Sequence, residues 1–272
     1  MSHYAVLVLH KSNNEEDYEN IIANMLALFD ENLKVKPYKY QTKEKAINYM
    51  KEHVVPFNDF MKDYSDEELL NWYLDEYSSY SLGEDGYIYT TYNPNSKWDW
   101  WCIGGRFSEY LSLTDKAFNR SLKEYKEQWG EEVLEDYREE YRYVSSAPVK
   151  DIQWITLLSP EKKEQLKRWW EINIEGDEPK EGEEKDKWFI WKPEYYKQRY
   201  KDADTYIKLQ EQACFHAVVT PDGIWHEPSE MGWFAMTDGD PADELKWDLA
   251  FYDTFIKTAD PDWIATIIDC HI

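Results

Sequence analysis

Apolar residues recur along the chain with two different periods. Residues 4–10, 87–92 and 214–220 are short runs rich in apolar and β-branched side chains, which is typical of β-strands. Residues 15–29 instead carry apolar side chains three or four positions apart, the spacing of a helix that buries one face. Residues 263–272 are again mostly apolar and predict a final strand. The pattern therefore places strands near both ends and in the middle of the chain, with helices between them.

The centre of the chain is more polar. Residues 108–212 have a mostly helical pattern, and within them residues 171–186 contain eight carboxylates and two lysines, which predicts a solvated, mobile acidic loop. We predict one α+β domain over residues 1–272. Its mixed sheet includes the first and last strands and is flanked by helices, and residues 108–212 form a helical insertion, the central lobe.

The composition limits the partners. Hydrophobic residues make up 42% and aromatic residues 17% of the chain, which is enough to form a packed core. Acidic residues outnumber basic ones by 55 to 31, and the net charge of −24 argues against direct binding to nucleic acid or to an anionic membrane. The same charge suggests an alternative function: an acidic inhibitor that imitates nucleic acid and occupies a host DNA- or RNA-binding protein.

Further features predict a cytoplasmic protein. The chain has no run of about 18 apolar residues, so we expect no membrane span. Its first residues lack the basic segment of a signal peptide. The three cysteines are far apart and form no Cys-x-x-Cys pair, which argues against a disulfide framework and against a thiolate zinc site.

Residues 92–107 concentrate the groups of a ligand site. Tryptophan rings stack on bases, arginine pairs with phosphate, and the backbone amides of adjacent glycines can turn toward an anion. The alternative is a core strand that ends in a tight turn, with Asp99 and Arg106 as a structural ion pair. We predict that the ligand-binding residues are Asn93, Lys97, Trp98, Asp99, Trp100, Gly104, Gly105 and Arg106, with Trp101 as a further stacking ring.

Groups that could transfer protons lie in the last fifty residues. His226 follows a predicted hairpin turn, and Glu230 lies close behind it. In the last strand, a period of two places Asp269 and His271 on one face. We predict these four as catalytic residues for hydrolysis, against the alternatives of a polar loop and of a strand with a polar end.

A zinc or manganese site would require His216, His226 and His271 to converge with Asp269 or Glu230. Sequence spacing does not establish that convergence, so we predict no metal ligands and leave the cofactor open.

Three segments together resemble a known group of proteins. They are the run from Asn93-Pro94 through Lys97-Trp98-Asp99-Trp100 to Ile103-Gly104-Gly105-Arg106-Phe107, the segment Phe29 to Val35, and the closing elements Glu230-Met231-Gly232-Trp233 and Ile268-Asp269-Cys270-His271-Ile272. They resemble an uncharacterised family of bacteriophage and prophage proteins, in which we expect valine at the position of Ile268. Residues 108–212 are outside this resemblance.

The resemblance implies a phage setting and a shared site. By analogy with phage accessory proteins that counter host defence, we expect the chain to bind, and in an enzymatic variant to hydrolyse, a small anionic nucleotide-like ligand. A second copy of the chain and a host defence protein are further expected partners. A phage structural or assembly factor, with tryptophans in the core and interface, is a third hypothesis.

Overall fold

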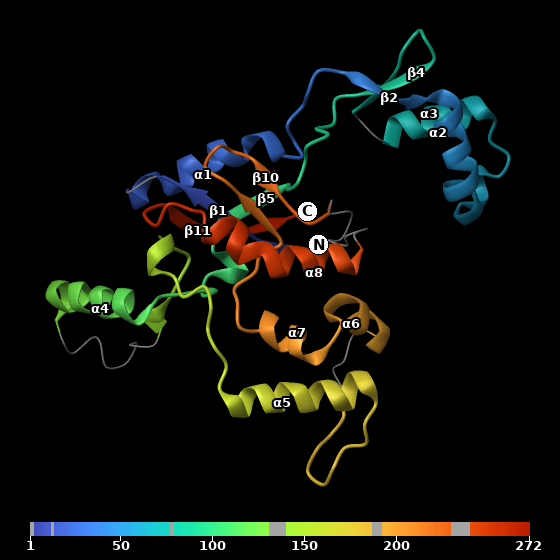
Figure 1. Ribbon diagram of the computed structural model, residues 1–272. Coiled ribbons are helices and arrows are strands. Elements are labelled where there is room, and N and C mark those ends of the chain that lie inside the picture. Colours follow the sequence, from blue (N-terminus) through green and yellow to red (C-terminus); the bar gives the residue numbers. More distant parts are fainter. Residues whose placement is uncertain (1–2, 12–13, 77–78, 131–139, 187–191, 230–239) are drawn as a thin grey trace. The chain divides into compact units, whose positions relative to one another are not determined.

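The computed structural model has an α+β fold, as the sequence predicts (Figure 1). It describes residues 3–11, 14–76, 79–130, 140–186, 192–229 and 240–272. The chain divides into two compact units, Met1–Leu26 with Trp100–Ile272 (unit 1) and Ala27–Asp99 (unit 2). We expected a single domain. Residues 27–99 form a unit apart from the rest of the chain because they bury a core of their own, which includes Met50, Leu69, Tyr73 and Ile88.

Unit 1 is built on a mixed sheet in which the first and last strands are neighbours. Strand β1 (His3–His10) pairs antiparallel with β11 (Ile264–His271), from His3 opposite His271 to His10 opposite Ile264. This confirms the prediction that these strands share a sheet. The strand order is β10-β9-β1-β11-β5, and β8 also pairs with β11. The other strands are β5 (Trp100–Ile103), β8 (Ser146–Pro148), β9 (Ala217–Val219) and β10 (Trp225–His226).

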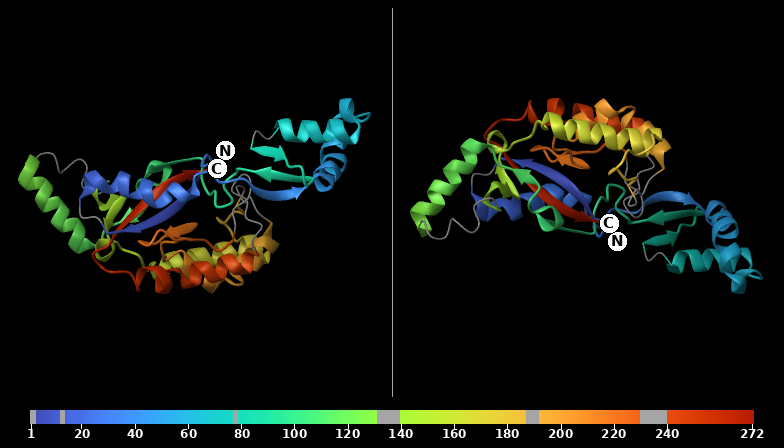
Figure 2. Two further views of the ribbon diagram at one scale, coloured as in Figure 1. Left: turned by 90° about the horizontal axis from the view of Figure 1, so that it is seen from above. Right: turned by 90° about the horizontal axis from the view of Figure 1, so that it is seen from below.

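Both faces of the central strands are covered. Leu7 and Ile267 lie on the face that packs against Phe251 at the end of α8 (Pro241–Phe251). Helix α1 (Tyr18–Leu26) covers the opposite face, where Ile22 is fully buried (Figures 1 and 2). Burial on both faces explains why these strands are continuous apolar runs in the sequence.

The central lobe has a helical part, as the sequence predicts. Helix α5 (Pro160–Trp170) begins at a Ser159 cap and continues as a helical turn, Glu171–Glu175, with Ile172 and Ile174 buried. Residues 171–175 therefore differ from the loop we predicted, because their two isoleucines pack inward. The remaining elements of this stretch are α4 (Asp115–Trp129), α6 (Pro193–Tyr200), α7 (Ala203–Leu209) and the short paired strands β6 (Leu111–Ser112) and β7 (Tyr143–Val144).

Unit 2 is a small sheet with helices. Its antiparallel strands follow the order β2-β4-β3, and the side chain of Thr42 caps α2. The elements are β2 (Tyr38–Thr42), α2 (Lys43–Tyr49), α3 (Asp66–Glu76), β3 (Tyr80–Leu82) and β4 (Tyr87–Thr90).

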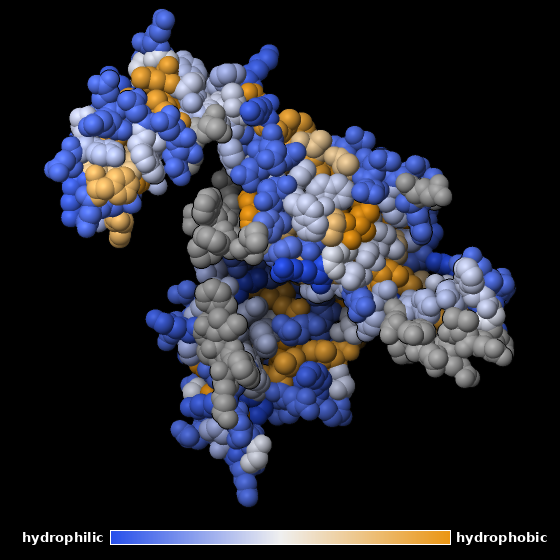
Figure 3. Space-filling model, turned by 180° about the vertical axis from the view of Figure 1, so that it is seen from behind, coloured by the Kyte–Doolittle hydropathy of each residue, from blue (hydrophilic) through white to orange (hydrophobic). Residues whose placement is uncertain are grey.

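Most of the surface in view is polar. The face drawn in Figure 3 is mostly hydrophilic, with smaller apolar patches between the polar side chains. Within the described ranges, every helix is too short or too polar to cross a membrane.

Candidate functional site

One end of the central strand pair brings His3, Asp269 and His271 together. The register places His3 opposite His271, and Asp269 lies two residues earlier on the same face of β11. Nδ1 of His3 is 2.8 Å from Oδ1 of Asp269. The rings of His3 and His271 are 5.1 Å apart at 66°. Two histidines and a carboxylate therefore meet where the first and last strands pair.

Asp269 is a buried carboxylate with both oxygens engaged. The residue is 1% exposed, Oδ1 accepts from His3, and Oδ2 accepts the backbone N–H of Arg106 at 3.0 Å. These bonds offset the cost of burying the charge. An ionised carboxylate only accepts hydrogen bonds, so the neutral tautomer of His3 that fits this contact carries its proton on Nδ1 and has Nε2 as its acceptor. Among the described residues, Nε2 of His3 has no hydrogen-bond partner, so it is the atom placed for proton transfer.

The Gly104-Gly105 turn shapes this arrangement. Both glycines have positive φ, 71° and 52°. A Cβ at Gly105 would lie 2.6 Å from Cβ and Oδ2 of Asp269 and 2.8 Å from Sγ of Cys102. The Gly104 amide donates to Ile267 in the sheet at 2.9 Å, and the Arg106 amide donates to Asp269. We predicted that amides of this turn would bind phosphate; instead, the anion beside the turn is the protein's own carboxylate.

An aromatic ring lies beside the histidines, and Arg106 is joined to the site through its backbone amide. Strand pairing places Trp100 opposite His271, and the Trp100 and His3 rings are 6.2 Å apart. Trp100 is 49% exposed. The Arg106 side chain is also exposed, and it forms no ion pair with the described residues of its own unit. We call His3, Trp100, Arg106, Asp269 and His271 the histidine site.

Four predicted ligand residues belong to unit 2 instead. Asn93 is 1% exposed, and its amide nitrogen donates to the carbonyls of Leu28 at 2.8 Å and of Asp30 at 2.9 Å. Trp98 is 9% exposed and forms a β-bridge with Asp30. These contacts give Asn93 and Trp98 structural roles. Lys97 is partly buried, and Asp99 is exposed.

His226 is separate from Asp269 and His271. Strands β9 and β1 lie between β10 and β11, so three strand spacings, roughly 14 Å, separate His226 from the last strand. The His226 ring packs against Phe255 at 5.3 Å, and Nε2 is 3.1 Å from the Thr220 hydroxyl. The structure therefore does not unite the four predicted catalytic residues. Glu230 lies outside the described residues.

In the part of the chain that the structure describes, the cysteines and the remaining histidines form no metal centre, and the cysteines are not activated as nucleophiles. His216 packs edge-on against Tyr4 with ring centroids 5.2 Å apart. No group of three His, Cys, Asp or Glu residues in the described ranges is placed to hold a metal ion. Burial and the charge of Asp269 raise the pKa of Cys102, and burial raises that of Cys270 well above its usual value. Both thiols are therefore protonated at neutral pH.

His3 was not among the predicted site residues. The first and last strands were predicted to share a sheet, but their direct pairing and register, which bring His3 opposite His271, come from the structure.

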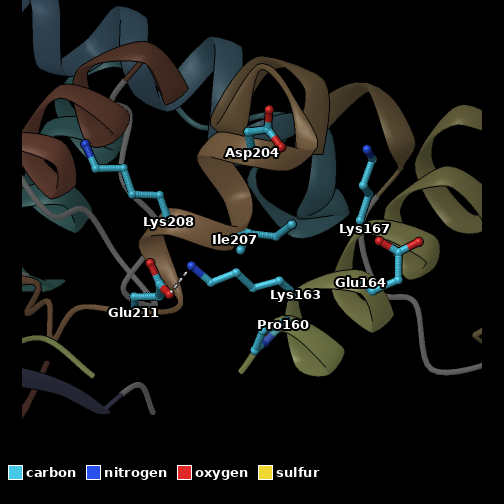
Figure 4. A pocket seen from close by; sticks show the side chains of 8 residues that line it. All are labelled: Pro160, Lys163, Glu164, Lys167, Asp204, Ile207, Lys208 and Glu211. Carbon is cyan, nitrogen blue, oxygen red and sulfur yellow. Dashed lines mark ion pairs between the residues drawn. The ribbon is translucent and has the colours of Figure 1, made fainter. Parts of the chain in front are cut away.

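A cavity of about 290 Å³ between α5 and α7 is lined by three lysines (Figure 4). Nζ of Lys163 pairs with Oε1 of Glu211 at 2.7 Å. The amines of Lys163, Lys167 and Lys208 point in different directions, so this cavity does not offer a convergent anion site (Figure 4).

Compared with models of protein families, with curated proteins and with solved structures, the chain matches none.

Proposed function

We propose that the histidine site binds a small, anionic, nucleotide-like ligand. The observation that carries the proposal is the His3–Asp269 pair, with the exposed Trp100 ring centred 6.2 Å from the His3 ring. The resemblance to bacteriophage proteins supports a role as a phage accessory protein that removes such ligands in the host cytoplasm.

Each group of the site suits one part of the ligand. The exposed ring of Trp100 offers a stacking surface for a base. The guanidinium of Arg106 can pair with a phosphate through two hydrogen bonds. In a chain with a net charge of −24, such a local cation offsets the repulsion that an anion meets.

In the enzymatic form of the proposal, His3 accepts a proton and Asp269 holds its ring in place. His271, with its ring 5.1 Å from that of His3, is the second group for proton transfer. Asp269 is then a positioning residue, and His226 takes no part.

Incubation with mononucleotides, dinucleotides and cyclic nucleotides tests the proposal. The mixture is chromatographed before and after heat denaturation. Depletion followed by release of intact ligand means binding alone, and a new product means catalysis. If no candidate is depleted, the proposal fails.

Matched variants locate the activity. Trp100→Ala should abolish depletion, whereas Trp129→Ala, which removes a 61% exposed ring on α4, should not. Asp269→Asn should reduce product formation much more than ligand binding if His3 transfers a proton.

The acidic-inhibitor alternative is favoured by the net charge of −24. This alternative predicts that the chain binds a basic DNA- or RNA-binding protein. It also predicts that neither Trp100→Ala nor Arg106→Ala weakens that binding.

A further inference from the structure

A second concave surface lies on α5, away from the residues of the histidine site. It is a cavity of about 640 Å³, within the range of ligand sites. We call it the α5 groove; its lining includes Glu161, Glu164, Trp169, Ile172, Lys180 and Glu184.

The floor of the α5 groove is apolar and held in place. Ile172 is 5% exposed, so its side chain is fixed by packing. The Trp169 ring stacks on Tyr206 at 5.5 Å and 20°, and its indole N–H donates to Oδ2 of Asp186 at 3.2 Å. A stacked ring with a bonded indole nitrogen is a rigid surface, which limits the entropy lost when a partner binds.

Arg168 also lines the groove and binds the chain that follows α5. Its Nη2 donates to Oε2 of Glu183 at 2.7 Å and to the carbonyl of Glu178 at 3.0 Å. Its Nε lies 3.0 and 3.1 Å from the two carboxylate oxygens of Glu183. The hydrogen bond to Arg168 lowers the pKa of Glu183 to about 2. These hydrogen bonds hold residues 178–183 against α5, so the shape of the groove depends on Arg168.

The charged side chains that line the groove are mostly negative. Four glutamates (Glu161, Glu164, Glu183 and Glu184) line it, against the two cations Arg168 and Lys180. The lining positions from 161 to 172 follow one face of the helix over roughly 16 Å. The groove is therefore elongated, with an apolar floor and an acidic rim.

We propose that the α5 groove binds an extended, lysine- or arginine-rich segment of a partner protein. The long stems of these side chains cover apolar surface while their charged ends reach carboxylates at the rim. A guanidinium or ammonium over the face of Trp169 adds a cation–π contact. The negative charge of the whole chain speeds the encounter with a basic partner. This surface is independent of the histidine site.

The test uses a fluorescein-labelled peptide of alternating lysine and leucine and the full chain, with binding measured by fluorescence anisotropy. Glu164→Lys should weaken binding of this peptide about fivefold, because one exposed ion pair with a peptide lysine is lost and the new lysine repels the peptide. Glu124→Lys is the matched control, because Glu124 is an exposed residue within α4 and the change in net charge is the same. It should change the affinity less than about twofold. A lysine–serine peptide of equal charge should bind more weakly, since serine leaves the apolar floor uncovered.

Three results would overturn this proposal. The first is that Glu164→Lys and Glu124→Lys weaken peptide binding equally, because the peptide would then be attracted only by the net charge of the chain. The second is no binding of the lysine–leucine peptide. The third is displacement of that peptide by spermidine at matched charge, which would make the groove a site for small cations.

Discussion

Replacing Gly105 by alanine tests the packing that holds Asp269. The added Cβ would meet Cβ and Oδ2 of Asp269 at 2.6 Å and Sγ of Cys102 at 2.8 Å, from a backbone with φ of 52°. An L-residue in that conformation costs about 1–2 kcal/mol. Forcing apart a packed, buried neighbour costs about 1–3 kcal/mol more. We therefore expect Gly105→Ala to lower the free energy of unfolding by about 2–5 kcal/mol.

Gly176→Ala separates these two contributions. Gly176 has φ of 90° in the same unit, and a Cβ there would meet no atom within 4 Å. Its replacement should cost only the conformational part, about 1–2 kcal/mol. Urea-induced unfolding followed by circular dichroism gives both values. Equal losses in the two variants would refute the claim that Gly105 is required by the close approach of Asp269.

Three further predictions concern buried groups. Burial lowers the pKa of His10 from 6.5 to about 4, and unfolding would restore it. Between pH 6.5 and pH 4 the unfolded chain therefore binds one more proton than the folded chain. The free energy of unfolding should fall by up to about 3 kcal/mol as the pH is lowered from 6.5 to 4. In His10→Gln this fall should be smaller. Asn93→Ala should cost about 2–3 kcal/mol in a thermal melt, because two carbonyls lose their donor. Thiol titration with a disulfide reagent at pH 8 should be slow in the native chain and fast in urea, since burial is the largest cause of the raised pKa of Cys102, Cys214 and Cys270.

The sequence was sufficient for the sheet but not for the full site. Apolar runs at both ends predicted that β1 and β11 share a sheet, and a period of two predicted that Asp269 and His271 share a face. It did not identify His3, because that contact depends on the register, and a slip of one residue would turn each side chain to the other face.

The stretch from 92 to 107 shows a second limit. Asn93 is a polar residue before a proline, which suits a ligand contact as well as a turn. Its bonds to Leu28 and Asp30 span more than sixty residues and leave no local pattern. Likewise, the Gly104-Gly105 pair indicated amides turned toward an anion, but only the fold shows that the anion is Asp269.

We propose that the ligand binds where His3 and His271 meet. The chain has six histidines, so labelling their rings for NMR gives few signals to assign. Addition of a nucleotide that the chain depletes should shift the ring signals of His3 and His271 and leave those of His53 and His226 unchanged. Shifts confined to His226, or binding with no shift at His3 and His271, would contradict the claim.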